Sequence, residues 1–286
     1  MSDFLSALAR HEFMQASLLV GLLASIACGV VGSYVVARRI TYIAGGIAHC
    51  VLGGMGAAHY LRAAQDWTWL SPIHGAFAAS IIAAIIIGFV SLRAKQREDT
   101  VISALWAIGM ATGVLFMHAT KGYHDDLISY LFGNIVLVAR EDVYLLVALD
   151  IVVVGVALVF YNQLQAVCFD EEFARLRGLN VEFYYILLLC LTALTVVTLV
   201  SAVGVIMVIA LLTLPVAIAA CFCRTLWQMM LVAALLSMVC TSGGFAVSYA
   251  PNLPPGAVMI LFAGAVYLLV IPATAVYHRL RRRRPA

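Results

Sequence analysis

Apolar runs of about 20 residues recur along this chain from Phe13 to Tyr277, with only short polar gaps between them. A helix needs about 20 mostly apolar residues to cross the hydrocarbon core of a bilayer. The composition agrees, because 64% of the residues are hydrophobic, 11% are charged and the mean hydropathy is +1.05. The sequence therefore predicts an all-α, polytopic membrane protein in which residues 1–286 form a single transmembrane domain.

Nine membrane spans are expected, and eight is the alternative because the boundary between the sixth and seventh runs is the weakest. The runs lie at 13–36, 42–61, 73–92, 100–118, 141–161, 182–200, 203–222, 229–249 and 256–276. The apolar stretch from Leu127 to Ala139 is too short to cross, so it is predicted to be a re-entrant or interfacial segment on the outer side.

The basic residues predict the orientation of these spans, because Lys and Arg accumulate in cytoplasmic loops. With the N-terminus outside, 13 of the 17 Lys and Arg residues fall on the cytoplasmic side, and only Arg10, Arg62, Lys121 and Arg140 fall outside. We therefore expect a cytoplasmic C-terminus. No cleavable signal peptide is expected, since the first apolar run is long and is followed by Arg38-Arg39. The seven cysteines lie mostly within spans and are predicted to pack as small hydrophobes rather than form disulfides.

The second span carries the most informative polar residue, in the stretch RRITYIAGGIAHCVLGGMGAAH. Helical spacing places Gly45, His49, Gly53 and Gly56 on one face, which leaves room for a partner helix or a passing ion. An intramembrane imidazole is costly and marks a functional site by default, and histidine is a ligand for transition metals. The other interpretation is a histidine that is hydrogen-bonded to a neighbouring helix.

Two residues beside His49 are weaker candidates. Cys50 lies about 100° further round the helix and is interpreted as packing, with a soft metal ligand as the minor alternative. His59 lies near the outer end of the same helix, where it could be an entry ligand or an ordinary interfacial histidine.

Asp150 is a second buried candidate, because it interrupts the apolar fifth span in VALDIVVV. A charge at that depth must find a partner or be neutralised. One hypothesis pairs Asp150 with His49 through a metal ion. The other gives it a hydrogen bond to a backbone carbonyl or to a threonine of the next span, the candidates being Thr192, Thr195 and Thr198.

Two further features are ambiguous. Pro215 is predicted to bend or break the seventh span, as in a discontinuous transport helix or a simple packing kink. An outer group of polar residues could collect metal but is more simply a solvated loop; it contains His118, His124, Asp125 and Asp126.

The longest polar segment lies between the fifth and sixth spans and reads NQLQAVCFDEEFARLRGLNVEF. Acidic residues from Asp170 to Glu172 open a short helix, and Arg175 and Arg177 close it, in agreement with the helix dipole. Gly178 suits the C-terminal cap. This cytoplasmic helix is either a docking element or an ordinary charged loop.

The sequence lacks the motifs of several enzyme classes. The chain has no GxxxxGK[ST] phosphate-binding loop, no HExxH and no recognisable serine or cysteine nucleophile motif. We therefore expect a protein that catalyses no reaction itself, with any nucleotide chemistry carried out by another subunit.

Four segments, in this order and spacing, resemble the membrane subunit of the zinc/manganese-type family of ABC importers. They are RRITYIAGGIAHCVLGG; EDTVISALWAIGMATG with DLISYLFGNIVLVAREDV; FDEEFARLRGLNVEF; and GVIMVIALLTLPVAIAACF followed by NLPPGAVMILFAGAVYLL. The resemblance implies a homodimeric permease in a bacterial inner or plasma membrane, two cytoplasmic ATPase subunits and an extracytoplasmic solute-binding protein. It also implies that residues 169–178 form the coupling helix that seats in the ATPase, with the contacts made by Phe169, Glu172, Ala174, Arg175 and Gly178.

The chain departs from this family at one position. Members typically carry an aspartate one turn before the histidine of the second span, and Gly45 stands there instead. The departure removes a hard ligand from the expected metal path, and Asp150 is the residue that could supply the missing charge.

We therefore expect a permease that imports a divalent transition metal, with zinc first and manganese next, as transported substrate and not as a bound cofactor. The alternatives are an importer of a metal chelate and, from another class, an ion-coupled secondary carrier that uses Asp150 and His49 as a relay. A membrane-embedded metal hydrolase is a more distant alternative. No nucleic-acid partner is expected.

Overall fold

The computed structural model describes residues 12–67, 69–93, 98–120, 140–249, 251 and 253–282, and these residues form helices without any strand. The all-α prediction is therefore confirmed for the described part of the chain. The helices are α2 Glu12–Arg38, α3 Thr41–Gln65, α4 Pro72–Arg93, α5 Glu98–Ala119, α7 Arg140–Val159, α8 Tyr161–Phe169, α9 Glu171–Leu176, α10 Val181–Val203, α11 Val205–Phe222, α12 Leu226–Tyr249 and α13 Pro255–Arg282.

Each predicted span coincides with one long helix, but the predicted number of spans is slightly too high. Among the described residues, seven helices are long and apolar enough to cross a membrane, or up to eight if α7 and α8 together form one bent span. The helix α3 is not among the seven, because glycines and histidines dilute its apolar residues. The predicted segment from Leu127 to Ala139 lies outside the described residues.

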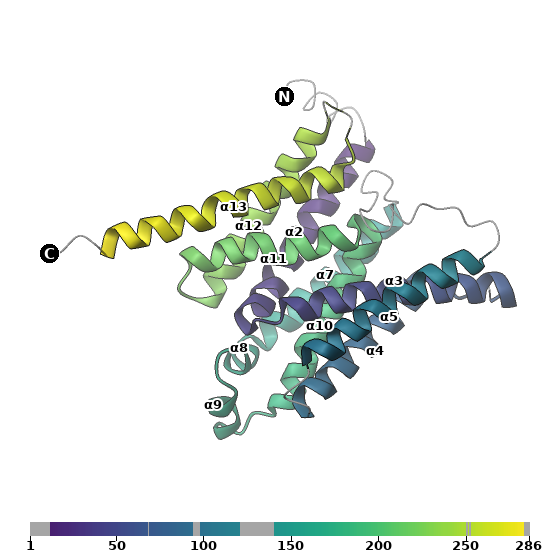
Figure 1. Cartoon of the computed structure of the whole chain (residues 1–286), viewed down its shortest axis with the longest axis horizontal. Coiled ribbons are helices and arrows are strands. Elements are labelled where there is room, and N and C mark those ends of the chain that lie inside the picture. The colour runs from purple at the N-terminus through teal and green to yellow at the C-terminus, as the bar shows by residue number, and fades with distance from the viewer. Residues whose placement is uncertain are drawn as a thin grey trace.

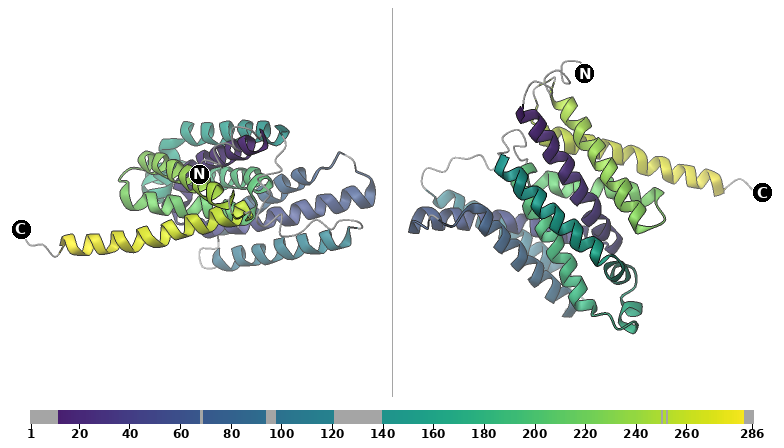
Figure 2. Two further views of the ribbon diagram at one scale, coloured as in Figure 1. Left: turned by 90° about the horizontal axis from the view of Figure 1, so that it is seen from above. Right: turned by 180° about the vertical axis from the view of Figure 1, so that it is seen from behind.

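The helix α10 lies in the middle of the bundle, where it packs against α2, α3, α4, α7 and α11. On one side of it, α3, α4 and α5 form a closely packed group, and on the other side α2 and α11 pack with α12, which also contacts α13. Figures 1 and 2 show the two groups splayed apart, with α13 extending away from the bundle. The arrangement places α3 between α4, α5 and α10 rather than at the edge.

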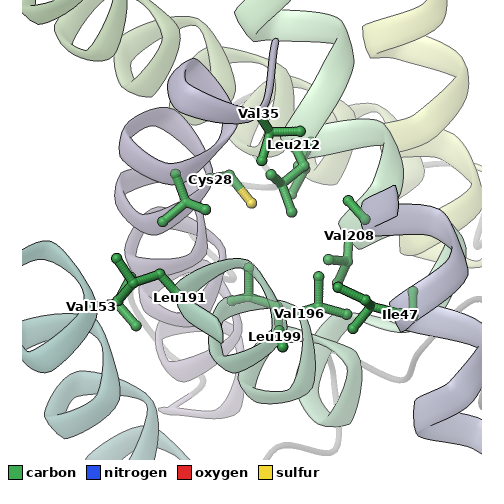
Figure 3. Close-up of a cluster of buried hydrophobic side chains, with 14 of the residues drawn as sticks. Cys28, Val35, Ile47, Val153, Leu191, Val196, Leu199, Val208 and Leu212 are labelled. Atoms are coloured by element: carbon green, nitrogen blue, oxygen red, sulfur yellow. The ribbon is translucent and has the colours of Figure 1, made fainter. Parts of the chain in front are cut away.

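Apolar side chains of α2, α3, α7 and α11 meet those of α10 in a buried cluster (Figure 3). They include Val196 and Leu199 of α10, Ile47 of α3 and Val208 of α11, all of which are almost completely buried. Ile47 lies two residues before His49, so the apolar core fixes the rotation of the helix that carries the imidazole.

A glycine separates the sixth and seventh predicted spans. Gly204 has φ 84° and ψ 157°, and it ends α10 at Val203 and caps the start of α11 at Val205. Only glycine adopts this backbone region readily, so the break is local and sharp. Of the two effects predicted for Pro215, the break is not seen, because α11 is continuous from Val205 to Phe222 with Pro215 buried inside it, and the bend stays a prediction. The proline removes one N–H donor, and the packed neighbours hold the helix together.

The chain turns sharply after the fifth predicted span. The axes of α7 and α8 differ by 70°, and α8 is followed directly by the short helix α9. Figure 1 shows α8, α9, the turn between α2 and α3, the turn between α11 and α12, and the C-terminal end of α13 toward the left of the molecule. The segments that carry most of the predicted cytoplasmic basic residues therefore lie toward one side.

Candidate functional site

The glycines of α3 are used for close packing against α5 and α4. A Cβ atom added at Gly53 would lie 2.8 Å from the carbonyl oxygen of Gly109, and one added at Gly56 would lie 2.9 Å from that of Gly113. On the neighbouring face, Gly54 meets Gly75 of α4 in the same way. Small residues allow such approach between membrane helices. The sequence predicted that this face leaves room for a partner helix or for a passing ion. Gly53 and Gly56 leave room for a partner helix, α5.

His49 is buried in α3, with 6% of its surface exposed. Its ring stacks on the indole of Trp106 from α5, with centroids 4.5 Å apart and planes 20° from parallel. The Nδ1 atom has no hydrogen-bond partner. The alternative of a histidine hydrogen-bonded to a neighbouring helix is thus not seen at this atom. A buried imidazole nitrogen without a partner is free to bind a proton or a metal ion.

A cavity of about 440 Å³ lies one turn before His49, beside Gly45. Trp106 forms part of its wall, and a Cβ atom at Gly45 would lie 3.4 Å from the indole ring. The remaining lining comes from the ends of α2 and α3 and from α11 and α13, and includes Thr41, Tyr42, Thr213 and Tyr267. The residue that replaces the expected aspartate therefore borders open space, and Trp106 stands between that space and the imidazole.

Asp150 lies elsewhere in the bundle. It is 8% exposed, and its Oδ2 atom has no hydrogen-bond partner. Its helix α7 packs mainly on α2 and α10, where Asp150 is within electrostatic range of Cys28, whereas α3 packs mainly on α4 and α5. The helices that carry Asp150 and His49 have different main neighbours, so the helix packing gives no support to a metal bridge between the two residues. Thr192 and Thr195, offered as alternative partners, donate to carbonyls of their own helix.

The other predicted ligands do not gather around His49. His59 is ten residues further along α3, which corresponds to about 15 Å of rise. The Cys50 thiol donates to the carbonyl of Leu105 on α5 at 3.5 Å, as expected for packing. His118 lies exposed at the end of α5, and the other members of that outer group, His124, Asp125 and Asp126, lie outside the described residues.

Within the described part of the chain, no three His, Cys, Asp or Glu side chains are arranged to hold a metal ion. A closed zinc site takes four protein ligands. A site with three or more such ligands around His49 therefore needs residues from outside the described part of the chain or from a second chain.

The helix predicted at residues 169–178 is present as α9 over the shorter range Glu171–Leu176, and Phe169 ends the preceding helix α8. Asp170 caps it by accepting a hydrogen bond from the Phe173 amide at 2.9 Å, and the chain leaves it through Gly178 at φ 78°. Ala174 is completely buried against the bundle, whereas Phe173 and Leu176 are 47% and 87% exposed, and Phe169, the last residue of α8, is 64% exposed. The helix therefore presents apolar side chains outward, in the manner of a docking surface.

Two contacts of the site were not predicted from the sequence. The residues around Trp106 form no pattern that identifies it as the partner of His49. The two rings meet because glycine contacts set the register between α3 and α5. Arg38 was predicted as a topological marker, and the structure shows it joining α2 to α8, α9 and α10.

Comparison with known proteins gives the family. A model of the ABC 3 transport family matches residues 10–274. The chain is 42% identical to an uncharacterised membrane protein of Synechocystis, over 91% of this chain and 90% of that one. It is 40% identical to a Chlamydia trachomatis protein named "Probable metal transport system membrane protein", over 88% and 86%. It is 30% identical to the manganese transport system membrane protein MntC of Listeria monocytogenes, over 93% and 92%.

One solved structure has the same architecture over almost its whole length. It is PsaBC from Streptococcus pneumoniae in complex with Fab, with a TM-score of 0.85 at 26% identity, over 98% of this chain and 99% of the matched one. The likeness extends from α2 to α13 and supports the helix order described above. Sequence and fold agree that this chain belongs to the ABC 3 transport family, a family of membrane transport proteins.

Proposed function

We propose that this protein is the membrane-spanning subunit of an ATP-driven importer for a divalent transition metal ion. The observation that carries the proposal is the family match over residues 10–274, and relatives of up to 41% identity named for metal or manganese transport support it. The proposed assembly is a homodimer with cytoplasmic ATPase subunits, an extracytoplasmic solute-binding protein and a cytoplasmic C-terminus.

His49 is the proposed contact for the ion in the membrane. A single buried imidazole with an unpartnered nitrogen suits a cargo that must be released, since transport requires binding that is weak enough to reverse. Imidazole favours zinc, whereas manganese prefers oxygen ligands. The named relatives favour manganese and the residues favour zinc, so competition between the two ions decides the substrate.

The helix α9 is the proposed contact with the ATPase. Its capped ends stabilise it, and the exposed side chains of Phe173 and Leu176, together with Phe169 at the end of α8, supply apolar surface for a groove. Glu172 and Arg175 are exposed beside them and can pair with charges on the partner.

Import of a metal chelate is the second candidate, and the cavity beside Gly45 favours it. Its volume of about 440 Å³ is much larger than the ~30 Å³ occupied by one water molecule. Among the described residues, its walls carry aromatic and hydroxyl groups and no carboxylate. An ion-coupled carrier has less support, because the relay it needs would have to join Asp150 to His49.

Uptake in cells tests the proposal. A strain without the gene is complemented with wild-type protein or with His49→Asn, and uptake of radioactive manganese, radioactive zinc and a preformed chelate is measured in competition. We expect His49→Asn to lower uptake of the preferred free ion by at least about tenfold, as for other losses at metal sites. His74→Asn is the matched control, because His74 is exposed and bonds to Ser71. Normal uptake by His49→Asn would contradict its role, and preferential uptake of the chelate would favour the second candidate.

A further inference from the structure

Arg38 contacts three helices besides its own. Its guanidinium forms an ion pair with Glu171, the first residue of α9. It also donates to the carbonyl of Val167 in α8 at 3.1 Å. Its charge lies over the ring of Tyr185 in α10, 5.2 Å from the centroid. The side chains of Arg38 and Glu171 are 21% and 34% exposed, so the pair is partly shielded from water.

The backbone next to Arg38 is held in a defined turn. The amide of Ile40 donates to Val35 at 2.9 Å and that of Arg39 donates to Val36 at 3.1 Å, which is the Schellman pattern at a helix end. Arg39 occupies the left-handed region at φ 64°, a position usually taken by glycine. The helix α3 begins at Thr41, only three residues after Arg38. A displacement of Arg38 therefore moves the start of the helix that carries His49.

From these contacts we infer that Arg38 is a positioning residue that joins α9 to the α2–α3 turn and so transmits movement of α9 to α3. The inference rests on the proposed function, in which α9 is the contact with the ATPase. A movement of α9 displaces Glu171, and Glu171 displaces Arg38 through the ion pair. The contacts with Val167 and Tyr185 keep the guanidinium of Arg38 oriented during this movement.

Arginine is suited to this task and lysine is not. The planar guanidinium offers several N–H donors in fixed directions and stacks on an aromatic ring at the same time. A lysine ammonium keeps the charge, but it cannot hold Glu171, Val167 and Tyr185 in one geometry. Replacement by lysine should therefore preserve assembly and weaken transmission.

Space for movement lies beside the contact. A polar cavity of about 510 Å³ separates α9 from the end of α4, and its lining includes Arg38, Glu171, Ser91 and Tyr185. The hydroxyl of Tyr185 contacts that of Ser91 at 3.0 Å. Among the described residues, α9 is bordered on this side by the polar cavity rather than by packed side chains, so a shift of α9 into this space meets no core packing there.

The test measures transport per ATP hydrolysed in the assembled complex. Wild-type protein, Arg38→Lys and Glu171→Gln are each reconstituted with the ATPase subunit and the solute-binding protein in proteoliposomes, and metal uptake and ATP hydrolysis are measured in the same sample. We expect both variants to bind the ATPase normally and to lower uptake per ATP by at least about fivefold, a modest coupling effect. Arg93→Lys is the matched control, because Arg93 is exposed at the end of α4 and stacks on Phe89 of its own helix.

An unchanged ratio of uptake to hydrolysis in Arg38→Lys and Glu171→Gln would overturn the inference. So would a loss that follows only the amount of assembled complex, because that result assigns Arg38 a structural role. Failure of the proposed function gives a different result, namely no ATP-driven uptake by the wild-type complex. That result would also remove the basis of this inference.

Discussion

At the scale of single residues, the buried polar groups differ in what surrounds them. His49 has an aromatic partner on one face and an open cavity one turn away. Asp150 is equally buried, but it lies among α2, α7 and α10 with one carboxylate oxygen unpartnered. Burial of an unpaired carboxylate destabilises a fold, whereas a neutral group of the same shape costs less. Burial alone therefore does not identify Asp150 as part of the transport path.

The substitution Asp150→Asn separates these roles. We expect it to leave the melting temperature of the detergent-solubilised protein unchanged or raised, and to keep metal uptake within about twofold of wild type, because the amide is neutral and has the shape of the acid. Melting and uptake are measured on the same preparation. Loss of uptake in a stable, assembled variant would instead place Asp150 in the path, as the sequence-based hypothesis required.

At the scale of helices, α3 depends on glycine contacts with its neighbours. The distances at Gly53 and Gly56 leave no room for a side chain between α3 and α5. The same contacts set the register that stacks Trp106 on His49. Packing in this group therefore controls the geometry of the candidate site.

Alanine substitution tests this packing. We expect Gly53→Ala to destabilise the protein by about 1–3 kcal/mol, because its Cβ atom would press on the backbone carbonyl of Gly109. Gly155→Ala is the matched control, since Gly155 is also helical but has nothing within 4 Å of the added Cβ atom. The control should be neutral or slightly stabilising, because alanine favours helix. Equal melting temperatures for the two variants would count against the packing argument.

The helix α9 gives a prediction about partner binding. Leu176 is 87% exposed, so Leu176→Glu should fold normally and weaken binding of the ATPase subunit by about tenfold or more, as for a contact at the centre of an interface. Affinity is measured between the purified subunits. Leu253→Glu, at a half-exposed leucine in the turn before α13, is the control. If Leu176→Glu binds as well as the control, the docking surface lies elsewhere.

The sequence predicts those features that depend on local pattern. Apolar runs place the long helices, and Asp170 and Gly178 mark the two ends of α9, because caps act within a few residues. It does not predict which helices touch, since nothing near Trp106 indicates that its indole meets His49, 57 residues earlier. The proposed pairing of Asp150 with His49 depends on the same kind of long-range contact, and the helix packing gives it no support. The helix break lies at Gly204, between α10 and α11, and α11 is continuous through Pro215.

At the scale of the whole molecule, the proposed docking helix α9 and the candidate site at His49 are linked within one chain. The helix α9 lies toward the side where most of the predicted cytoplasmic basic residues are found, and α3 carries His49 into the bundle from that side. Arg38 lies between them, in contact with α9 and three residues before α3. The arrangement suits a subunit that receives movement from an ATPase and changes access to a path beside α3.

The source of energy for transport tests this account most directly. The chain is reconstituted in proteoliposomes with and without its ATPase subunit, and uptake of radioactive manganese or zinc is measured with ATP alone and with a proton or sodium gradient alone. We predict uptake only when the ATPase and ATP are both present, with no effect of collapsing the ion gradients. Uptake by this chain without the ATPase, driven by an ion gradient, would contradict the account.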